Sequence, residues 1–199
     1  EAHHEAGGML RMGINAFRLP RTILDAEIGA LVESGIKILT DRPVGKIDDL
    51  FKQEFQAAIL CTGAHQDLRL NVPGEEASGV NGAVEMLRRV NDGTHPNIKG
   101  KVLVIGGGNS AIDAARAAVR LGADKVTICY RRERGEMPAR PSEIREAEEE
   151  GVKIQFRVAP EKVVSDHGKV KGLELIRMKM GKPDESGRRR PEPITGSQF

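Results

Sequence analysis

A glycine-rich turn in the stretch "VLVIGGGNSAIDAA" contains the residues of this chain with the clearest chemical meaning. Gly106, Gly108 and Ala111 follow the spacing G-x-G-x-x-A, a variant of the dinucleotide-binding fingerprint. The first glycine allows a tight turn, the second lets the backbone reach a pyrophosphate, and the small third residue lets helix and strand pack closely. Unpaired N–H groups of the first helical turn then face the anion. The expected cofactor-binding residues of this loop are Gly106, Gly107, Gly108, Asn109, Ser110 and Ala111.

Two arginines at the end of the next apolar run indicate which dinucleotide is bound. The run ends in "CYRRER", which gives Arg131 and Arg132 with no acid at the strand tip. A ribose 2′-hydroxyl is usually held there by Asp or Glu, whereas a 2′-phosphate needs cations, and Arg offers a planar fork for phosphate oxygens. We therefore expect NADP(H) rather than NAD(H). The alternative is a solvated turn in which Glu133 and Glu136 balance the two arginines.

The elements that must position this loop alternate between strand and helix. Apolar runs predict strands over residues 102–105, 125–130 and 152–158, and helical periodicity predicts helices over 109–121 and 142–150. This alternation predicts an α/β fold with a Rossmann-like, doubly wound parallel sheet.

A small antiparallel piece is expected after this sheet. Residues 161–165 and 170–178 flank "DHGK", which has the composition of a hairpin turn. The tail from Gly181 is rich in Pro, Gly and Arg, and we expect an extended, solvated loop there.

The first hundred residues predict a second unit. A helix is expected between Pro20 and Gly35, followed by strands over 36–40 and 57–63. The second of these strands is short and continuously apolar, as in a parallel sheet buried on both faces.

A domain boundary is expected where the apolar content falls. Residues 64–100 carry many glycines and prolines around one predicted helix near 83–90. We therefore divide the chain into a first domain of residues 1–70 and a second of residues 71–199.

Composition excludes several classes of protein. The 31 Lys and Arg residues nearly balance 29 Asp and Glu, so a net charge of +2 argues against nucleic acid or an anionic membrane as the main partner. No apolar run approaches the roughly 18 residues of a membrane helix, and a cytoplasmic protein is expected. Cys61 and Cys129 lie in separate apolar runs and are expected to be buried thiols. The histidines lack metal-ligand spacing, so no metal site is predicted.

Taken together, the motifs resemble a known family: the FAD- and NAD(P)H-dependent oxidoreductases typified by the small (beta) subunit of NADPH-dependent glutamate synthase. The flavin portion of dihydropyrimidine dehydrogenase is a relative. The resemblance covers essentially the whole chain and rests on the ordered segments "EAHHEAGGMLRMGI", "FRLPRTILDAEI", "AAILCTGAH", "VPGE", "VIGGGNSAIDAARAAVRLGA", "YRRERGEMPA" and "SGRRRPEPITGSQF".

The resemblance implies a fold, a reaction and a second set of site residues. It implies an NADPH domain inserted into an FAD-binding Rossmann-like domain, with hydride passing from NADPH to FAD. No catalytic acid or base is implied, because the cofactors supply this chemistry. Electrons would leave through iron–sulfur clusters outside this chain to a larger partner subunit or domain. The flavin-side residues that it implies are Glu1, Gly7, Gly8, Met9, Leu10, Arg18, Val44, Thr62, Gly63 and Ala64.

The departures from the family pattern are equally informative. A flavin fold needs its own pyrophosphate loop ahead of Glu1 and a return segment after Phe199, and neither is present. We therefore expect an internal fragment that holds the NADP(H) domain and the middle of the FAD domain, and that is inactive alone. The pyridine nucleotide disulfide reductases are set aside, because no closely spaced pair of redox cysteines is present.

Two alternatives from other classes stay open. The chain could be a nucleotide-binding or assembly module without turnover, docking through "SGRRRPEP". A weaker alternative is that Arg188, Arg189 and Arg190 form a nucleic-acid patch, although no aromatic side chains accompany them to stack on bases.

Overall fold

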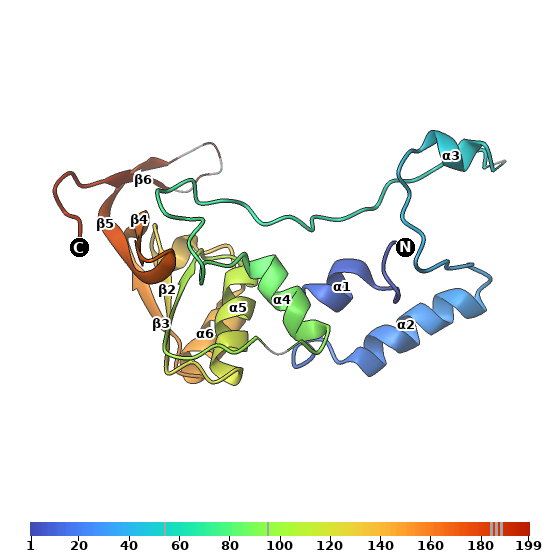
Figure 1. Cartoon of the computed structure of the whole chain (residues 1–199), viewed down its shortest axis with the longest axis horizontal. Helices are drawn as coiled ribbons and strands as arrows, with labels where there is room; N and C mark the ends of the chain where they lie inside the picture. Colours follow the sequence, from blue (N-terminus) through green and yellow to red (C-terminus); the bar gives the residue numbers. More distant parts are fainter. Residues whose placement is uncertain (54, 95, 184, 186, 188) are drawn as a thin grey trace.

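A three-stranded parallel sheet organises the C-terminal part of the chain in a computed structural model, which describes every residue except 54, 95, 184, 186 and 188 (Figure 1). Strands β1 (Lys101–Ile105), β2 (Lys125–Tyr130) and β3 (Lys153–Phe156) pair in that order. The crossovers are helices α5 (Asn109–Arg120) and α6 (Pro141–Glu149). The predicted α/β fold with a parallel sheet is confirmed.

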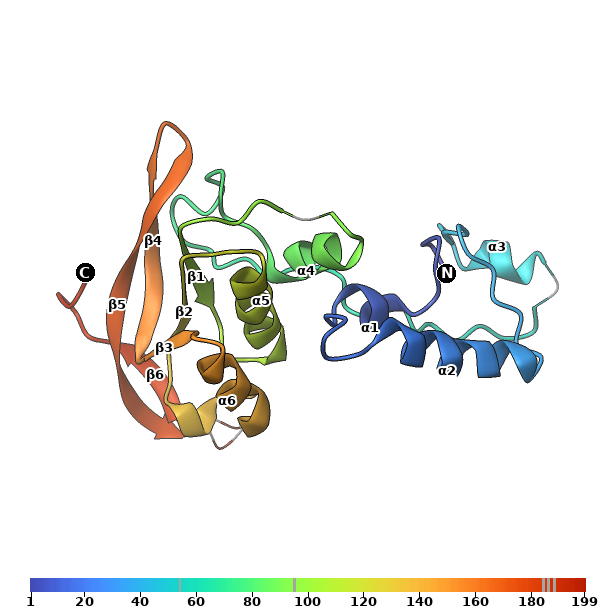
Figure 2. The ribbon, with the colours of Figure 1, turned by 90° about the horizontal axis from the view of Figure 1, so that it is seen from below.

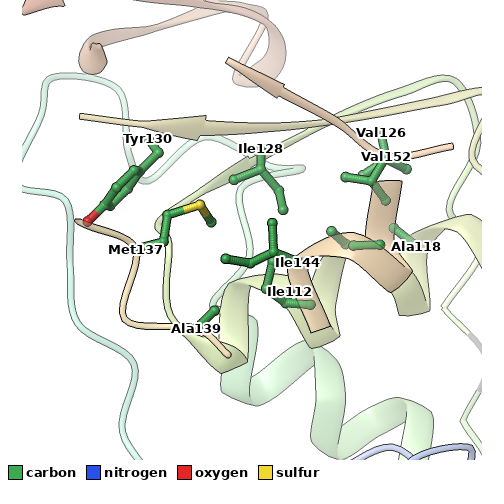
Figure 3. Packing of buried hydrophobic residues seen from close by; sticks show 11 residues of the cluster. Ile112, Ala118, Val126, Ile128, Tyr130, Met137, Ala139, Ile144 and Val152 are labelled. Carbon is green, nitrogen blue, oxygen red and sulfur yellow. The ribbon is translucent and has the colours of Figure 1, made fainter. Parts of the chain in front are cut away.

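Both crossover helices cover the same face of this sheet (Figure 2). Side chains alternate along a strand, so Val126, Ile128 and Tyr130 of β2 all point to the helices, where Ile112 and Ile144 meet them (Figure 3). Alanines on α5 and α6 let the helices approach the strands closely. The cluster comprises Ile112, Ala115, Ala118, Val126, Ile128, Tyr130, Met137, Ala139, Ile144, Ala147 and Val152.

A long hairpin covers the opposite face of the sheet (Figure 2). It is formed by β4 (Val158–Asp166) and β5 (Lys169–Pro183), which pair antiparallel. Cys129 of β2 points away from the helices and packs against Val158 and Leu175 of this hairpin. The end of β2 is therefore buried on both faces, which matches its nearly continuous apolar sequence, whereas Leu103 of β1 is 45% exposed.

The turns of this region follow from their backbone angles. His167 and Gly168, inside the predicted "DHGK" turn, have φ of 46° and 74°, the pair of positive values that a two-residue type I′ hairpin requires. Arg157 has φ 57° and separates β3 from β4, so the strand predicted over 152–158 is two strands. The tail, for which a solvated loop is predicted, instead forms β6 (Arg189–Pro193), which pairs with β5.

Four described helices precede the sheet (Figure 1): α1 (Gly8–Met12), α2 (Arg21–Glu33), α3 (Asp48–Phe51) and α4 (Ala83–Asn91). Helix α4 lies between α1 and α5 and contacts both (Figure 2). The predictions of α2 and α4 are confirmed. A single-turn 3-10 helix, η1 (Arg134–Glu136), follows β2.

The two strands predicted in the first seventy residues are wrong. Residues 36–40 and 57–63 are extended but form no strand, and Ile59 and Leu60 are 89% and 70% exposed. A parallel strand needs a neighbour for its backbone hydrogen bonds, and none of the described strands pairs with either segment. Apolar composition alone therefore does not make a strand here.

The two cysteines differ in burial. Cys129 is buried as expected, and burial raises the pKa of its thiol to about 11. Cys61 is exposed, contrary to prediction, because the buried strand that would have contained it does not form.

Helix α2 buries little of its apolar face. On α2 only Leu24 is buried, whereas Leu31 and Val32 are half exposed. Within the described residues, no helix combines the length and apolarity needed to cross a membrane.

Candidate nucleotide-binding site

Gly106 opens the turn between β1 and α5 with a backbone angle that disfavours other residues. Its φ is 140°, and its N–H donates to the carbonyl oxygen of Cys129 at 3.2 Å. A Cβ on Gly106 would lie 3.2 Å from the Cβ of Ala111. The turn at Gly106 therefore packs directly against Ala111, so both positions require small residues, as the fingerprint predicts.

Gly107 is fixed by an aromatic ring. A Cβ added to this buried glycine would lie 2.5 Å from the ring of Tyr130. The Tyr130 hydroxyl donates to the carbonyl oxygen of Glu136 at 2.6 Å, and the Gly107 carbonyl accepts from the Ala139 N–H at 3.1 Å. The glycine turn is therefore tied to the loop that follows β2.

Gly108 leaves the amino end of α5 open. Its φ and ψ of −89° and 176° suit any residue, and a Cβ there would meet nothing within 4 Å. No side chain of a described residue caps α5, and the Asn109 Oδ1 instead accepts from the N–H of Arg140 at 3.3 Å. Asn109 and Ser110 are exposed. An uncapped helix end beside open space is a suitable site for a pyrophosphate.

The two arginines after β2 have different surroundings. Arg131 is exposed and makes no ion pair or hydrogen bond with any described residue. Arg132 is only 7% exposed, and its Nε donates to the carbonyl oxygen of Arg189 at 2.9 Å. Both follow β2, whose end lies beside the end of β1, so the loop and the arginines share one edge of the sheet.

The two acids that follow Arg132 in the sequence, Glu133 and Glu136, form ion pairs with arginines from other segments of the chain. Glu133 pairs with Arg157 and Arg189, and Glu136 pairs with Arg189. Within the described residues, neither carboxylate pairs with Arg131. Of the alternative in which these acids balance Arg131 and Arg132, the part that concerns Arg131 is not seen among the described residues, whereas the charge of Arg132 does help to lower the pKa of Glu136.

Several residues of the flavin-side set gather around the first helix. Gly7 and Gly8 begin α1 with φ of 124° and 47°, followed by Met9 and a half-exposed Leu10. A Cβ on Gly63 would lie 3.7 Å from the Met9 side chain, so this turn and the segment Thr62, Gly63, Ala64 are adjacent. Residues 62–66 line an open hollow.

Glu1 lies beside this group, and Val44 is on the segment that is hydrogen-bonded to Glu1. The Glu1 carboxylate accepts from the N–H of His3, which lowers the pKa of Glu1, and the Glu1 carbonyl accepts from the N–H of Arg42 at 2.9 Å. Val44 follows on the same segment and is 58% exposed. The His3 ring stacks on His65 with centroids 6.2 Å apart, which joins the N-terminal segment to the hollow.

Arg18 lies at the junction with the second unit. Its guanidinium pairs with Asp113 on α5 and Glu143 on α6, two carboxylates with side chains 4% and 8% exposed. Burial raises the pKa of Asp113, and Arg18 opposes that shift. Asn15 donates to the Asp113 carbonyl oxygen at 3.2 Å. Sequence reasoning missed Asp113 and Glu143, although a carboxylate within an alanine-rich helix was a usable signal.

Phe17 completes this junction. Its ring lies under the guanidinium groups of Arg116 and Arg120, whose carbons are 4.8 Å and 3.8 Å from the ring centroid. Both arginines pair with Glu150 at the end of α6, and they lower the pKa of Glu150 to about 2. Cation–π and ionic contacts together bind residues 15–18 to α5 and α6.

Histidines, cysteines and carboxylates do not assemble into a metal centre. Among the described residues, no group of three or more of these side chains is arranged to hold a metal ion.

Comparison with known sequences identifies what this arrangement is similar to. Residues 18–183 match the family described as pyridine nucleotide-disulphide oxidoreductase. The beta subunit of the NADP(+)-dependent formate dehydrogenase of Moorella thermoacetica is 45% identical over 205 residues, covering 100% of this chain and 29% of that protein. The beta subunit of the NADPH-Fe(3+) oxidoreductase of Geobacter sulfurreducens is 43% identical over 199 residues, covering 97% of this chain and 30% of that subunit.

The resemblance to glutamate synthase is also confirmed. The small chain of the NADPH glutamate synthase of Escherichia coli is 36% identical over 213 residues, covering 100% of this chain and 45% of that protein. The chain thus spans less than half the length of these relatives. Among solved structures, FprA of Mycobacterium tuberculosis in complex with NADPH superposes with a TM-score of 0.83 at 19% identity, covering 100% of this chain and 60% of that one.

Setting aside the disulfide reductases was wrong at the level of the family. The match extends over most of the chain, although Cys61 is exposed, Cys129 is buried and the two are far apart in the sequence. The family match therefore does not depend on a closely spaced redox cysteine pair.

Proposed function

Because the chain belongs to the pyridine nucleotide-disulphide oxidoreductase family, we propose that it is the NADPH-binding portion of a flavin-dependent oxidoreductase. The observation that carries this proposal is the uncapped amino end of α5, which shares a sheet edge with Arg131, an arginine unpaired among the described residues. N–H groups and a helix dipole favour a pyrophosphate, and a guanidinium favours a further phosphate. Relatives named for NADP(+) or NADPH support the same choice.

The residues of the loop have separate roles in binding. The backbone of Gly106, Gly107 and Gly108 and the first turn of α5, with Asn109, Ser110 and Ala111, would hold the pyrophosphate. Arg131 would reach the 2′-phosphate from the surface. Arg132 would add the positive charge of a buried guanidinium next to Arg131, while its Nε keeps its hydrogen bond to the Arg189 carbonyl oxygen. The open space at Gly108 is what a bound phosphate requires.

The chain's own contribution to the reaction is position and electrostatics. When bound, NADPH supplies a hydride and FAD accepts it. The glycine loop and Arg131 fix the orientation of the nucleotide, and no side-chain acid or base is needed for a hydride transfer.

A flavin-side role is proposed for the first domain. We assign residues 1–70 to the middle of an FAD-binding domain and residues 71–199 to the NADPH-binding domain. The turns at Gly7 and Gly8 and at Thr62, Gly63 and Ala64 would approach the flavin, with Glu1 and Val44 toward its adenosine. Arg18 would act beside this group from the junction, where it pairs with Asp113. In the whole protein, iron–sulfur clusters and a larger partner subunit would take up the electrons.

A second candidate function is a nucleotide-binding or assembly module that does not turn over. The observation favouring it is that the apolar segments around Ile59 and Leu60 are exposed and unpaired within the described chain, so the flavin side lacks a sheet of its own there. Docking through "SGRRRPEP" is less favoured, because Arg189 is turned inward to Glu133 and Glu136. Arg188 lies outside the described residues. The inward position of Arg189 also weighs against a nucleic-acid patch.

Two assays separate these functions. Displacement of fluorescent NADPH by adenosine 2′,5′-bisphosphate, but not by adenosine 5′-monophosphate, supports the proposed site and its phosphate preference. Oxidation of NADPH after addition of FAD would add turnover to binding, whereas binding without oxidation supports the module. Absence of displacement by either adenosine compound contradicts the assignment of the loop.

A further inference from the structure

Arg189 on β6 is the centre of an ion-pair network with the segment 131–136, which follows β2. Its Nε donates to Glu136 Oε1 at 3.0 Å, and its backbone N–H donates to the same oxygen at 3.1 Å. A terminal nitrogen of its guanidinium pairs with Glu133. Its carbonyl oxygen accepts the hydrogen bond from Arg132 Nε at 2.9 Å. Arg189 therefore engages both acids and one arginine of the segment 131–136.

The two acids would otherwise oppose a phosphate at this edge. Glu133 and Glu136 closely follow Arg131 in the sequence, and their side chains are only 29% and 12% exposed. The hydrogen bonds from Arg189 are the main reason that the pKa of Glu136 lies below its ordinary value, so this carboxylate is charged at neutral pH. Partly buried charges are poorly screened, and like charges across a binding site disfavour a ligand.

Strand pairing fixes Arg189 in this position. β6 pairs antiparallel with β5, with Arg189 opposite Pro183 and Pro191 opposite Met180. Two neighbouring arginines form ion pairs nearby, but within the described residues neither of them pairs with both acids. Arg134 pairs with Glu148, and Arg157 pairs with Glu133 from an exposed position. Arg189 reaches both acids, and its backbone is held in a strand while it does so.

We propose that Arg189 is a specificity-determining positioning residue that holds Glu133 and Glu136 away from Arg131, so that the loop favours a nucleotide carrying a 2′-phosphate. This inference rests on the proposed function and adds a residue to it. Arg189 acts through the two acids rather than by touching the nucleotide. Without its guanidinium, Glu136 loses its ion-pair partner among the described residues and Glu133 keeps Arg157 alone. The two carboxylates then place negative charge beside Arg131 that Arg189 no longer offsets.

The test is a calorimetric titration of NADPH and NADH into the chain and its variants. Arg189→Gln is expected to weaken NADPH by about tenfold, in line with one charge-assisted contact, and to leave NADH within about twofold. Adding Glu133→Gln and Glu136→Gln to Arg189→Gln should restore most of the NADPH affinity, because the competing carboxylates are gone. Arg177→Gln, an exposed arginine on β5 that lies over Phe199, is the matched control and should change neither affinity.

Each outcome has one meaning. Equal loss of both nucleotides without rescue by the glutamine pair makes Arg189 a structural residue and overturns the inference. Unchanged NADPH affinity in Arg189→Gln also overturns it, while the proposed function stands. If the unsubstituted chain does not prefer NADPH, the proposed function and the inference about Arg189 both fail.

If Arg189→Gln does not fold, Arg189→Lys is the second variant. It keeps the positive charge but loses the planar guanidinium that can bind two carboxylates, so its NADPH affinity should fall while its NADH affinity is unchanged. Equal losses of the two nucleotides in Arg189→Lys would overturn the inference.

Discussion

Arg18 and Asp113 form a hydrogen-bonded ion pair although 95 positions separate them in the sequence. The pair joins the segment after α1 to helix α5, and Glu143 of α6 shares the same guanidinium. One oxygen of Asp113 and one of Glu143 are buried without any hydrogen-bond partner in the described structure. The ion pairs with Arg18 therefore offset part of the free-energy cost of burying the Asp113 and Glu143 carboxylates at this junction.

Replacing Arg18 with Met should destabilise the chain by about 3 kcal/mol, because it leaves two buried carboxylates without this cation. The measurement is the free energy of unfolding from urea titration. Arg42→Met, at an exposed position, is the control. A loss below about 0.5 kcal/mol, the range of ordinary surface substitutions, would contradict this role of Arg18 at the junction.

Gly107 and Gly108 predict opposite effects of the same substitution. Gly107→Ala should lower the free energy of unfolding by about 1–3 kcal/mol, because its methyl group meets the Tyr130 ring. Gly108→Ala should leave stability within about 0.5 kcal/mol, since its methyl points into open space, but should weaken NADPH at least about tenfold. Thermal unfolding and calorimetry on both variants check this. Equal effects of the two substitutions on binding and on stability would sink the distinction.

Arg131→Ala should discriminate between the two nicotinamide nucleotides. Loss of a charge-assisted contact to the 2′-phosphate predicts a roughly 10- to 100-fold weaker NADPH affinity, with NADH unchanged. Arg145→Ala, an exposed arginine on α6, controls for the general effect of charge. Equal losses for NADPH and NADH would remove the phosphate assignment, and no loss for either would move the site elsewhere.

The ion pairs of Glu150 should make the free energy of unfolding depend on pH under acidic conditions. Its pKa falls from 4.5 to about 2 in the folded chain, with the hydrogen bond from Arg120 as the largest cause and Arg116 adding to it. Because the folded state binds this proton less tightly than the unfolded state, the contribution to stability is complete above pH 4.5 and is lost as the pH falls toward 2. Glu150→Gln should reduce the slope of unfolding free energy against pH in that window. An unchanged slope would show that the pair does not couple to folding.

Local patterns were sufficient to predict the fold around the glycine turn. The strand–helix alternation places Gly106 at the end of β1 and Arg131 after β2, so parallel pairing brings them to one edge. The hairpin was predictable for the same reason, since its turn is encoded by His167 and Gly168. These features depend on residues near one another in the sequence.

Features that depend on distant partners could not be predicted in this way. Ile59 and Leu60 have strand composition, but a strand needs a paired neighbour, and they remain exposed. Arg189 lies in a segment with the composition of a solvated tail, and only the β5–β6 pairing brings it to Glu133 and Glu136. Arg18 similarly finds Asp113 through tertiary packing that no spacing rule describes.

The most direct measurement of the central claim is a calorimetric titration of the unsubstituted chain with NADPH and, separately, with NADH. We expect saturable binding of NADPH to one site, at least about tenfold tighter than NADH, since one charge-assisted contact distinguishes them. Equal affinities, or binding of neither nucleotide, would contradict the claim that the open end of α5 and Arg131 form a site for a 2′-phosphorylated dinucleotide.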